Sequence, residues 1–119
     1  MKKQMSVLAA AGLFAMSGWA SSAVAAEPIV GQWRAPGGGI VEIAPCGGAY
    51  CATVIRGEHK GKSVGQMSGS GASYTGTVTD PRDEKTYAGT VEVAPGGASL
   101  KLEGCALKIF CKTQTWTRL

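Results

Sequence analysis

Histidine, aromatic side chains and net charge are all scarce in this sequence. One histidine and eight aromatic residues are spread over 119 positions, and the formal charge is +4. His59 stands between Glu58 and Lys60 in a polar stretch, where a lone histidine is usually solvated. A zinc site needs further ligands, a Ser or Cys nucleophile needs a base, and no Gly-x-Ser-x-Gly elbow occurs. We therefore expect no catalytic residue, no metal and no cofactor.

The weak charge argues against nucleic acid as a partner. Lys2 and Lys3 belong to a leader described below, so the rest of the chain has 12 − 2 = 10 basic and 8 acidic residues, a net charge of +2. No cluster of Lys and Arg interleaved with aromatic residues occurs, and such a patch is the usual footprint of nucleic-acid binding.

Long apolar runs are absent except near the N-terminus. A run from about Met5 to Trp19 follows the two lysines, and small residues fill Ser22–Ala26. This pattern is typical of a secretory signal peptide, and the run is shorter than the roughly 18 to 20 residues of a spanning helix. We expect a signal peptide at 1–26, no membrane anchor, and a periplasmic or secreted product. The remaining 119 − 26 = 93 residues, 27–119, form a single domain.

Four cysteines are present, and none has the Cys-x-x-Cys spacing of redox or zinc sites. Cys46 and Cys51 flank a turn with two glycines, and Cys105 and Cys111 flank a second short segment. Each pair could bridge the two strands of a hairpin, and disulfides persist in an exported protein. Local pairing is favoured; the alternative is cross-pairing, with Cys46 near Cys111.

Helical periodicity is also missing after the leader, whereas alternation with a period of two recurs. Apolar or aromatic residues alternate with Thr and charged residues at 40–43, 74–79, 86–93, 100–103 and 113–118. Gly- and Pro-containing turns separate these segments. Gly76 and Gly89 on the inward faces indicate room for a large ring or a tightly coiled sheet. The Gly- and Ser-rich stretch Gly57–Ala72 is expected to hold a loop and one or two short strands.

The two ends of the domain predict how the sheet closes. If Gly31-Gln32-Trp33 pairs with the last strand, Arg118 can lie over the Trp33 ring in a cation–π contact. We expect an all-β fold, a small closed antiparallel barrel of about eight strands, with a small sandwich as the alternative. Because side chains fill most of such a barrel, its cavity should be small.

Candidate binding residues come from the inward aromatic positions. Trp116, Tyr87 and Tyr74 could line a ligand pocket, with Gln114 as the polar group that orients the ligand. Core packing explains the aromatic residues equally well. Asp80–Lys85 concentrates carboxylates, but its spacing fits neither a calcium loop nor an acid/base pair, so a hairpin turn opened by Asp-Pro is favoured.

Two sets of residues resemble known families. Gly31-x-Trp33 with Arg118 in the last strand is similar to the signature of lipocalins and related calycin barrels. Asp80-Pro81, Lys85-Thr86-Tyr87, Gly104-Cys105 and the run from Cys111 to Arg118 resemble the exported bacterial family known as domain of unknown function 2147. The resemblance implies a barrel fold and export, and it implies no activity. Two departures are Glu84, where the family usually has Gly, and a shorter and more polar stretch at 57–71.

These observations favour a non-enzymatic periplasmic barrel that binds a small, partly apolar ligand in or at the mouth of its lumen. The alternative is a protein-interaction module, such as an envelope-stress factor or a small barrel inhibitor of an exported protease. In that case the stretch Gly57–Ala72 would be a mobile loop that inserts into the partner's cleft. We expect a monomer or a weak homodimer.

Overall fold

The computed structural model describes residues 27–107 and 110–119 of the chain. The predicted signal peptide, 1–26, lies outside the described residues. In the part of the chain that the structure describes, no helix is long and apolar enough to cross a membrane.

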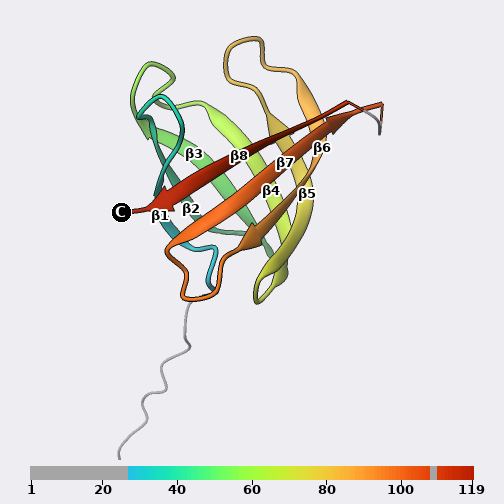
Figure 1. Ribbon diagram of the computed structural model, residues 1–119. Coiled ribbons are helices and arrows are strands. Elements are labelled where there is room, and N and C mark those ends of the chain that lie inside the picture. The colour runs from blue at the N-terminus through green and yellow to red at the C-terminus, as the bar shows by residue number, and fades with distance from the viewer. Residues whose placement is uncertain (1–26, 108–109) are drawn as a thin grey trace, which may run out of the picture.

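Eight antiparallel strands form a closed barrel in which each strand pairs with its neighbours in sequence and β1 pairs with β8 (Figure 1). The described residues contain no helix. The prediction of a small all-β barrel is confirmed, and the sandwich alternative is excluded. The strands are β1 (Gly31–Arg34), β2 (Ile40–Cys46), β3 (Ala49–Arg56), β4 (Ser63–Ser70), β5 (Ser73–Thr79), β6 (Thr86–Val93), β7 (Ser99–Ala106) and β8 (Phe110–Arg118).

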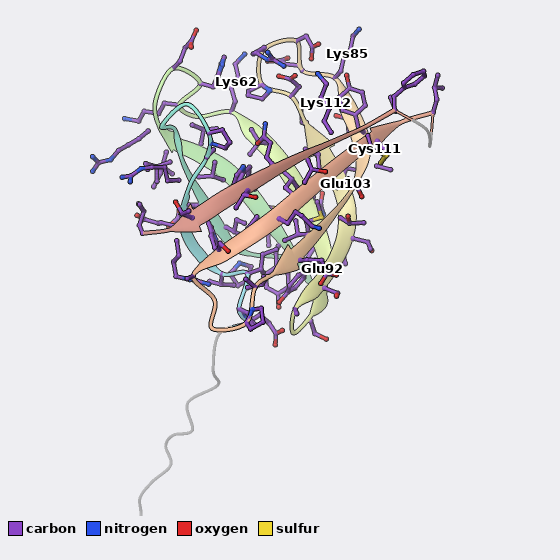
Figure 2. All side chains as sticks on the ribbon, viewed as in Figure 1. Lys62, Lys85, Glu92, Glu103, Cys111 and Lys112 are labelled. Atoms are coloured by element: carbon purple, nitrogen blue, oxygen red, sulfur yellow. A yellow bond between two sulfur atoms is a disulfide. The ribbon has the colours of Figure 1, made fainter. Side chains whose placement is uncertain are left out.

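Side-chain alternation decides which face of each strand points into the barrel. In β6, Gly89, Val91 and Val93 are buried and their neighbours Thr90 and Glu92 are exposed. Charged side chains such as Glu92 and Glu103 lie on the outer surface, and Lys62 and Lys85 lie on loops at one end (Figure 2). Apolar residues turned inward remove their surface from water, which is the main favourable contribution to folding.

The largest fully buried side chains are Trp33, Tyr74, Ile29 and Leu100. Trp33 lies opposite Arg118 in the β1–β8 pairing, and the guanidinium carbon of Arg118 is 4.1 Å from the centre of the Trp33 ring. The indole Nε1 donates to the carbonyl of Ile29 at 3.0 Å. The cation–π contact expected from the sequence is therefore present, and it closes one end of the barrel.

Arg118 also donates to three backbone carbonyls, from two segments of the chain, at this closed end. Its Nε donates to the Gly97 carbonyl at 2.6 Å and its Nη1 to the Val30 carbonyl at 3.0 Å, and Nη2 donates to the Pro28 carbonyl. Gly31 leaves room for the guanidinium, since a methyl group at this position would lie 2.5 Å from Nη1, and its φ is +144°. Packing against Arg118 thus explains why glycine precedes Gln32-Trp33.

Both disulfides pair locally, as the spacing favoured. Cys46–Cys51 spans the β2–β3 hairpin with Cα atoms 5.8 Å apart, and Cys105–Cys111 spans the β7–β8 hairpin with Cα atoms 4.0 Å apart. Cross-pairing of Cys46 with Cys111 is excluded. Because β2–β3 and β7–β8 turn at opposite ends of the barrel, each end carries one covalent link.

The expectation of a loop and short strands over Gly57–Ala72 is confirmed, since a loop over residues 57–62 is followed by one strand. Residues 63–70 form β4, which pairs with β3 on one side and β5 on the other. Val64 and Met67 point inward and are buried, but the Gly and Ser residues around them hid the alternation. The lack of a side chain at Gly65 is structural, because a methyl group there would lie 3.1 Å from the Thr77 carbonyl oxygen.

Gly76 and Gly89 allow close approach of neighbouring strands, so the coiled-sheet interpretation is the correct one. A methyl group at Gly76 would collide with the backbone of Gln66, and one at Gly89 would collide with the Val78 side chain and lie 3.1 Å from the Glu103 carbonyl oxygen. Neither Trp116 nor Tyr87 is among the groups that such a methyl would meet first. These glycines therefore shape the barrel wall.

Candidate functional site

The two ends of the barrel differ because successive hairpins turn at alternate ends. The β2–β3, β4–β5 and β6–β7 turns lie at the end closed by Trp33 and Arg118. The β1–β2, β3–β4, β5–β6 and β7–β8 connections gather at the other end (Figure 1). No buried cluster of large side chains fills that second end among the described residues, since the fully buried residues with the largest volumes belong to the first.

A cavity of about 900 Å³ occupies this open end. The expectation of a small cavity is wrong, and the reason lies in the size of the side chains that line it. The inward positions here are mostly small, whereas the large ones gather at the closed end. The apolar part of the lining includes Val41, Val54, Val64, Val78, Leu102, Ala106, Phe110 and Trp116.

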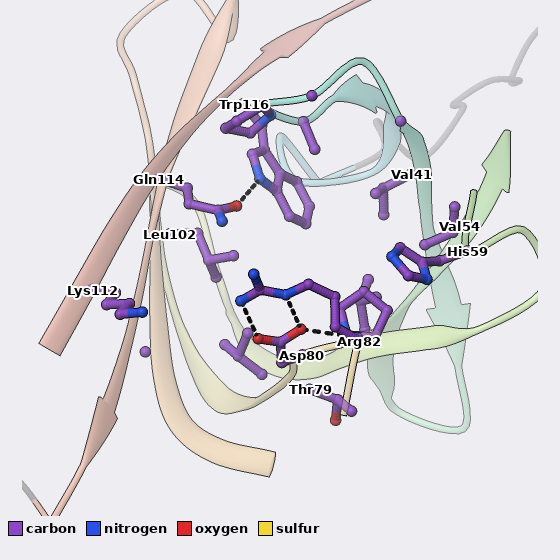
Figure 3. A pocket seen from close by; sticks show the side chains of 18 of the residues that line it. Val41, Val54, His59, Thr79, Asp80, Arg82, Leu102, Lys112, Gln114 and Trp116 are labelled. Atoms are coloured by element: carbon purple, nitrogen blue, oxygen red, sulfur yellow. Dashed lines mark hydrogen bonds and ion pairs between the residues drawn. The ribbon is translucent and has the colours of Figure 1, made fainter. Parts of the chain in front are cut away.

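Trp116 and Gln114 form the best-defined polar feature of the cavity (Figure 3). Trp116 is 6% exposed, and its Nε1 donates to Oε1 of Gln114 at 2.9 Å. An indole N–H can only donate, so this contact fixes which end of the Gln114 amide carries oxygen. The amide NH₂ remains, and within the described residues no acceptor bonds to it. Gln114 therefore offers two donors to the cavity.

Asp80 and Arg82 form an ion pair at the mouth (Figure 3). Arg82 Nε donates to Oδ1 of Asp80 at 3.0 Å, and Nη2 donates to Oδ2 at 2.7 Å. The backbone N–H of Arg82 also donates to Oδ1, at 2.9 Å. These hydrogen bonds, with those from the side chain first, lower the pKa of Asp80 from 3.8 to about 2, and Asp80 in turn raises the pKa of Arg82. Asp80 is a permanent anion at neutral pH.

Further charged groups surround the mouth. Arg56, Glu58, His59 and Lys112 line the cavity, and His59 is half-buried there. Lys62 links two of the mouth loops, since its Nζ lies 3.0 Å from Glu84 Oε2 and donates to the Pro81 carbonyl at 3.2 Å. The rim is therefore polar and partly cross-linked by charge, above an apolar floor.

The structure brings together three of the four binding candidates. Trp116, Gln114 and Tyr87 line the cavity, whereas Tyr74 does not. Tyr74 is 1% exposed, packs edge-on against Tyr50 with ring centres 5.8 Å apart, and donates to Glu27 at 3.3 Å. Burial raises its pKa. Alternation gives the face on which a side chain lies but not its height along the barrel, and Tyr74 is the second residue of β5, near the closed end.

Other cavity residues were missed in the sequence. In the sequence, the pattern at Val41, Val54 and Val64 indicates only that these side chains point inward. The pattern is the same whether side chains fill the lumen or leave a cavity. Asp80 and Arg82 were assigned to a hairpin turn, and the turn is present: Glu84 N donates to the Asp80 carbonyl at 2.7 Å. The signal for their role is the Asp-Pro-Arg spacing, which lets the arginine fold back onto the carboxylate.

One group of possible metal ligands occurs in residues 27–107 and 110–119: Glu103, Cys105 and Cys111 have ligand atoms within 4.8 Å of one another. Both sulfur atoms are used in the Cys105–Cys111 disulfide. While that bond is intact, this group lacks the thiolates that a metal would need.

Residues 61–118 match the model of a protein family described as an uncharacterized protein conserved in bacteria (DUF2147). Searches of curated proteins and of solved structures gave no significant match. The matched residues begin just before β4, so Gly31, Trp33 and the Cys46–Cys51 disulfide lie outside them. The match and the closed eight-stranded barrel confirm the resemblance to this bacterial family. Glu84, which departs from the usual glycine, keeps a glycine-like φ of +61°.

Proposed function

We propose that this chain, a closed barrel whose C-terminal strands match that uncharacterised bacterial family, is an exported, non-enzymatic protein that binds a small, partly apolar molecule. The observation that carries the proposal is the cavity of about 900 Å³ at the open end. Its volume lies within the roughly 300 to 1,000 Å³ of typical small-molecule sites, which are apolar with a few placed polar groups.

The lining restricts the chemistry of the ligand. Trp116 and Leu102 offer apolar surface, on which an aliphatic or aromatic body can be buried. The NH₂ of Gln114 lines the same cavity, and a ligand that buries it without an acceptor incurs a desolvation penalty of about 1 to 3 kcal/mol. The preferred ligand therefore carries a carbonyl, ether or hydroxyl oxygen beside its apolar part.

The charged groups at the mouth favour binding over catalysis. Asp80 accepts three hydrogen bonds from Arg82, and its pKa of about 2 makes it a weak base near neutral pH. His59 has no described carboxylate partner that would orient its ring, as the base of a nucleophile usually requires. Arg82 is paired with Asp80. Among the described lining residues, the remaining cations Arg56 and Lys112 outnumber the one remaining anion, Glu58, which suits a ligand with partial or full negative charge at its exposed end.

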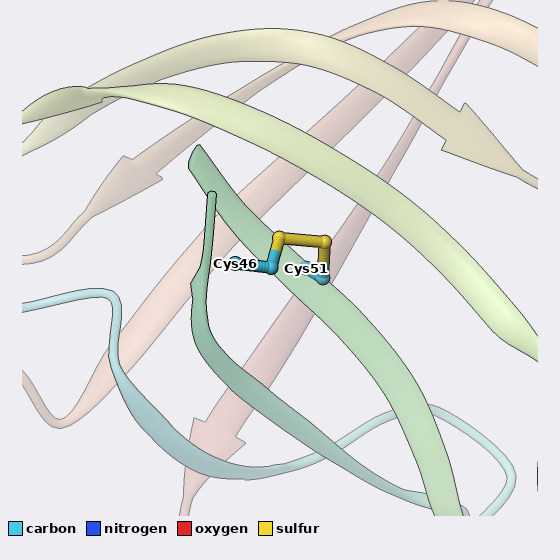
Figure 4. The surroundings of a disulfide bond; sticks show 2 residues. All are labelled: Cys46 and Cys51. Atoms are coloured by element: carbon cyan, nitrogen blue, oxygen red, sulfur yellow. A yellow bond between two sulfur atoms is a disulfide. The ribbon is translucent and has the colours of Figure 1, made fainter. Parts of the chain in front are cut away.

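Export is supported by the covalent links. Cys46–Cys51 (Figure 4) and Cys105–Cys111 use all four cysteines, and disulfides persist in oxidising compartments such as the bacterial periplasm. The leader pattern at 1–26 supports the same location.

A substitution that fills the cavity tests the proposal. Leu102→Trp places an indole in the lumen, whereas Lys101→Trp, the matched control, places the same group on the outer face of the same strand. The probe is anilinonaphthalene sulfonate, an apolar dye with an anionic end. We expect saturable binding by the unaltered protein and by Lys101→Trp, and its loss in Leu102→Trp. Equal binding by both variants would refute a site in the cavity.

A further inference from the structure

Strands β1 and β8 close the barrel over only a short length. β1 has four residues and β8 has nine, and the register joins them at two positions, Trp33 with Arg118 and Arg34 with Thr117. On its other side, β8 pairs with β7 from Phe110 to Thr117. Most of β8 is therefore paired on one side alone.

The alternation of hydrogen-bond direction along β8 shows which of its backbone N–H and C=O groups have no partner strand. Arg118 N donates toward β7, to the Ala98 carbonyl at 2.9 Å, and Leu119 N donates toward β1, to the Gln32 carbonyl at 3.1 Å. In an antiparallel ladder this direction alternates along the strand. The N–H and C=O groups of Thr113 and Thr115 thus point toward the β1 side, as do those of Leu119.

The ladder stops because of the β1–β2 hairpin. The register would place Pro36 opposite Thr115, and proline has no N–H to donate. The chain turns at that point, with Ala35 N bonded to the Gly39 carbonyl at 2.8 Å. No backbone hydrogen bond among the described residues reaches Thr113 or Thr115 from this side. These residues form an exposed sheet edge, which can pair with another extended chain.

This edge borders the cavity. Lys112, Gln114 and Trp116 alternate with the two threonines and line the cavity wall. A strand added beside β8 would direct every second side chain inward next to Lys112 and Gln114, while the register places Ala35 opposite Trp116. The added strand would therefore combine backbone pairing with side-chain insertion into a preformed pocket.

We infer that the β8 edge at Thr113 and Thr115 binds an extended segment of a partner polypeptide, antiparallel to β8, with an apolar residue beside Gln114 and an acidic residue beside Lys112. A second copy of β8 does not meet this requirement, because its own inward residues include Lys112 and Gln114. An inward charge of this kind disfavours pairing between identical edges. The inference goes beyond small-molecule binding and does not depend on it.

Amide hydrogen exchange with a probe peptide tests the edge directly. The probe is acetyl-Thr-Leu-Thr-Glu-Thr-amide, whose Leu and Glu would lie beside Gln114 and Lys112 and whose first two threonines would pair with Thr115 and Thr113. In the free protein, the amides of Thr113 and Thr115 should exchange much faster than those of Gln114 and Trp116, which face β7. Saturating peptide should slow exchange at the two threonines by about tenfold or more, as expected for new ladder hydrogen bonds.

A proline substitution in β8 should selectively block the pairing of a peptide with this edge. Thr113→Pro removes an N–H that has no described partner, whereas Thr113→Val keeps the N–H and is the matched control. We expect Thr113→Pro to weaken peptide binding about tenfold or more and Thr113→Val to leave it nearly unchanged. A peptide with Lys in place of Glu should bind about twofold to fivefold more weakly. Dye binding in the cavity should survive in Thr113→Pro, so that this test and that of the proposed function can fail separately.

Three results would overturn the inference. The first is slow exchange at Thr113 and Thr115 in the free monomer, and the second is peptide binding that leaves their exchange unchanged. The third is protection of these amides that rises with protein concentration together with dimer formation in sedimentation, which would identify a second copy as the occupant. Should Thr113→Pro fail to fold, the exchange measurement on the unaltered protein still decides.

Discussion

Replacement of Arg118 should destabilise the barrel more than a surface substitution, and by an amount that depends on the shape of the replacement. The guanidinium lies 4.1 Å from the Trp33 ring and makes two part-buried hydrogen bonds, to the Gly97 and Val30 carbonyls. The cation–π contact contributes about 1 kcal/mol, and each hydrogen bond about 1 kcal/mol. Arg118→Met should therefore lower the free energy of unfolding by about 3 kcal/mol.

Arg118→Lys separates charge from shape. Lysine keeps the positive charge near the Trp33 ring, but its ammonium group cannot reach several carbonyls at once as the planar guanidinium does. We expect a loss of about 1 to 2 kcal/mol, intermediate between the unaltered protein and Arg118→Met. A domain of this size has a total stability of about 5 to 10 kcal/mol, so the difference is easily resolved.

Urea unfolding with the disulfides intact, followed by tryptophan fluorescence, measures these losses. The midpoint should fall in the order unaltered protein, Arg118→Lys, Arg118→Met, while the slope of the transition stays constant. Outward Lys101→Met serves as a control and should stay within about 0.5 kcal/mol of the unaltered protein. If Arg118→Lys were as stable as the unaltered protein, the hydrogen bonds from the Arg118 guanidinium to the backbone carbonyls would contribute nothing to the free energy of unfolding.

Three further predictions concern residues at the mouth of the barrel. Glu84→Gly should stabilise by about 0.5 to 1 kcal/mol in thermal or urea unfolding, because Glu84 has a φ of +61° and its exposed ion pair with Lys62 contributes little. Lowering the pH from about 4 to 2 should cost below about 1 kcal/mol of stability as Asp80 protonates, and Asp80→Asn should lack that component. Mutating both cysteines of Cys105–Cys111 to serine should cost about 2 kcal/mol on the chain-entropy account.

Each of these has its own control. Glu84→Ala loses the same ion pair without gaining glycine's freedom, so a gain as large as that of Glu84→Gly would contradict the role given to φ. The folded pKa of Asp80 lies below its ordinary 3.8, so its contribution is complete above that pH and disappears as the pH falls through about 2. An acid profile unchanged by Asp80→Asn would contradict the ion pair with Arg82. Unchanged stability of the serine double variant would show that the hairpin needs no covalent link.

The closure of the barrel was predictable because it depends on local patterns and on few residues. Trp33 and Arg118 mark the first and last strands, and the short spacing of each cysteine pair allows a bridge across a hairpin. Strand β4 was predicted only as one or two short strands without bounds, since Gly65 and the serines around Val64 and Met67 replace the usual β-branched residues. Glycine there serves close packing of strands, which a single sequence does not reveal.

The size and the position of the cavity could not be predicted from the sequence, for two physical reasons. Tyr74 and Trp116 both lie on inward faces, but strand stagger puts Tyr74 at the closed end and Trp116 in the cavity. Whether Val41, Val54 and Val64 fill a lumen depends on the barrel's diameter, which follows from the number and tilt of strands taken together. The unpaired edge of β8 likewise follows from register, which only the structure provides.

Native mass spectrometry of protein taken from the periplasm of a bacterial host tests most directly whether the open end of the barrel binds a small molecule. The unaltered protein and Lys101→Trp should carry an added small-molecule mass at one per chain, and Leu102→Trp should not. Repeated preparations of the unaltered protein without added mass, or an added mass that persists in Leu102→Trp, would contradict the proposed binding site.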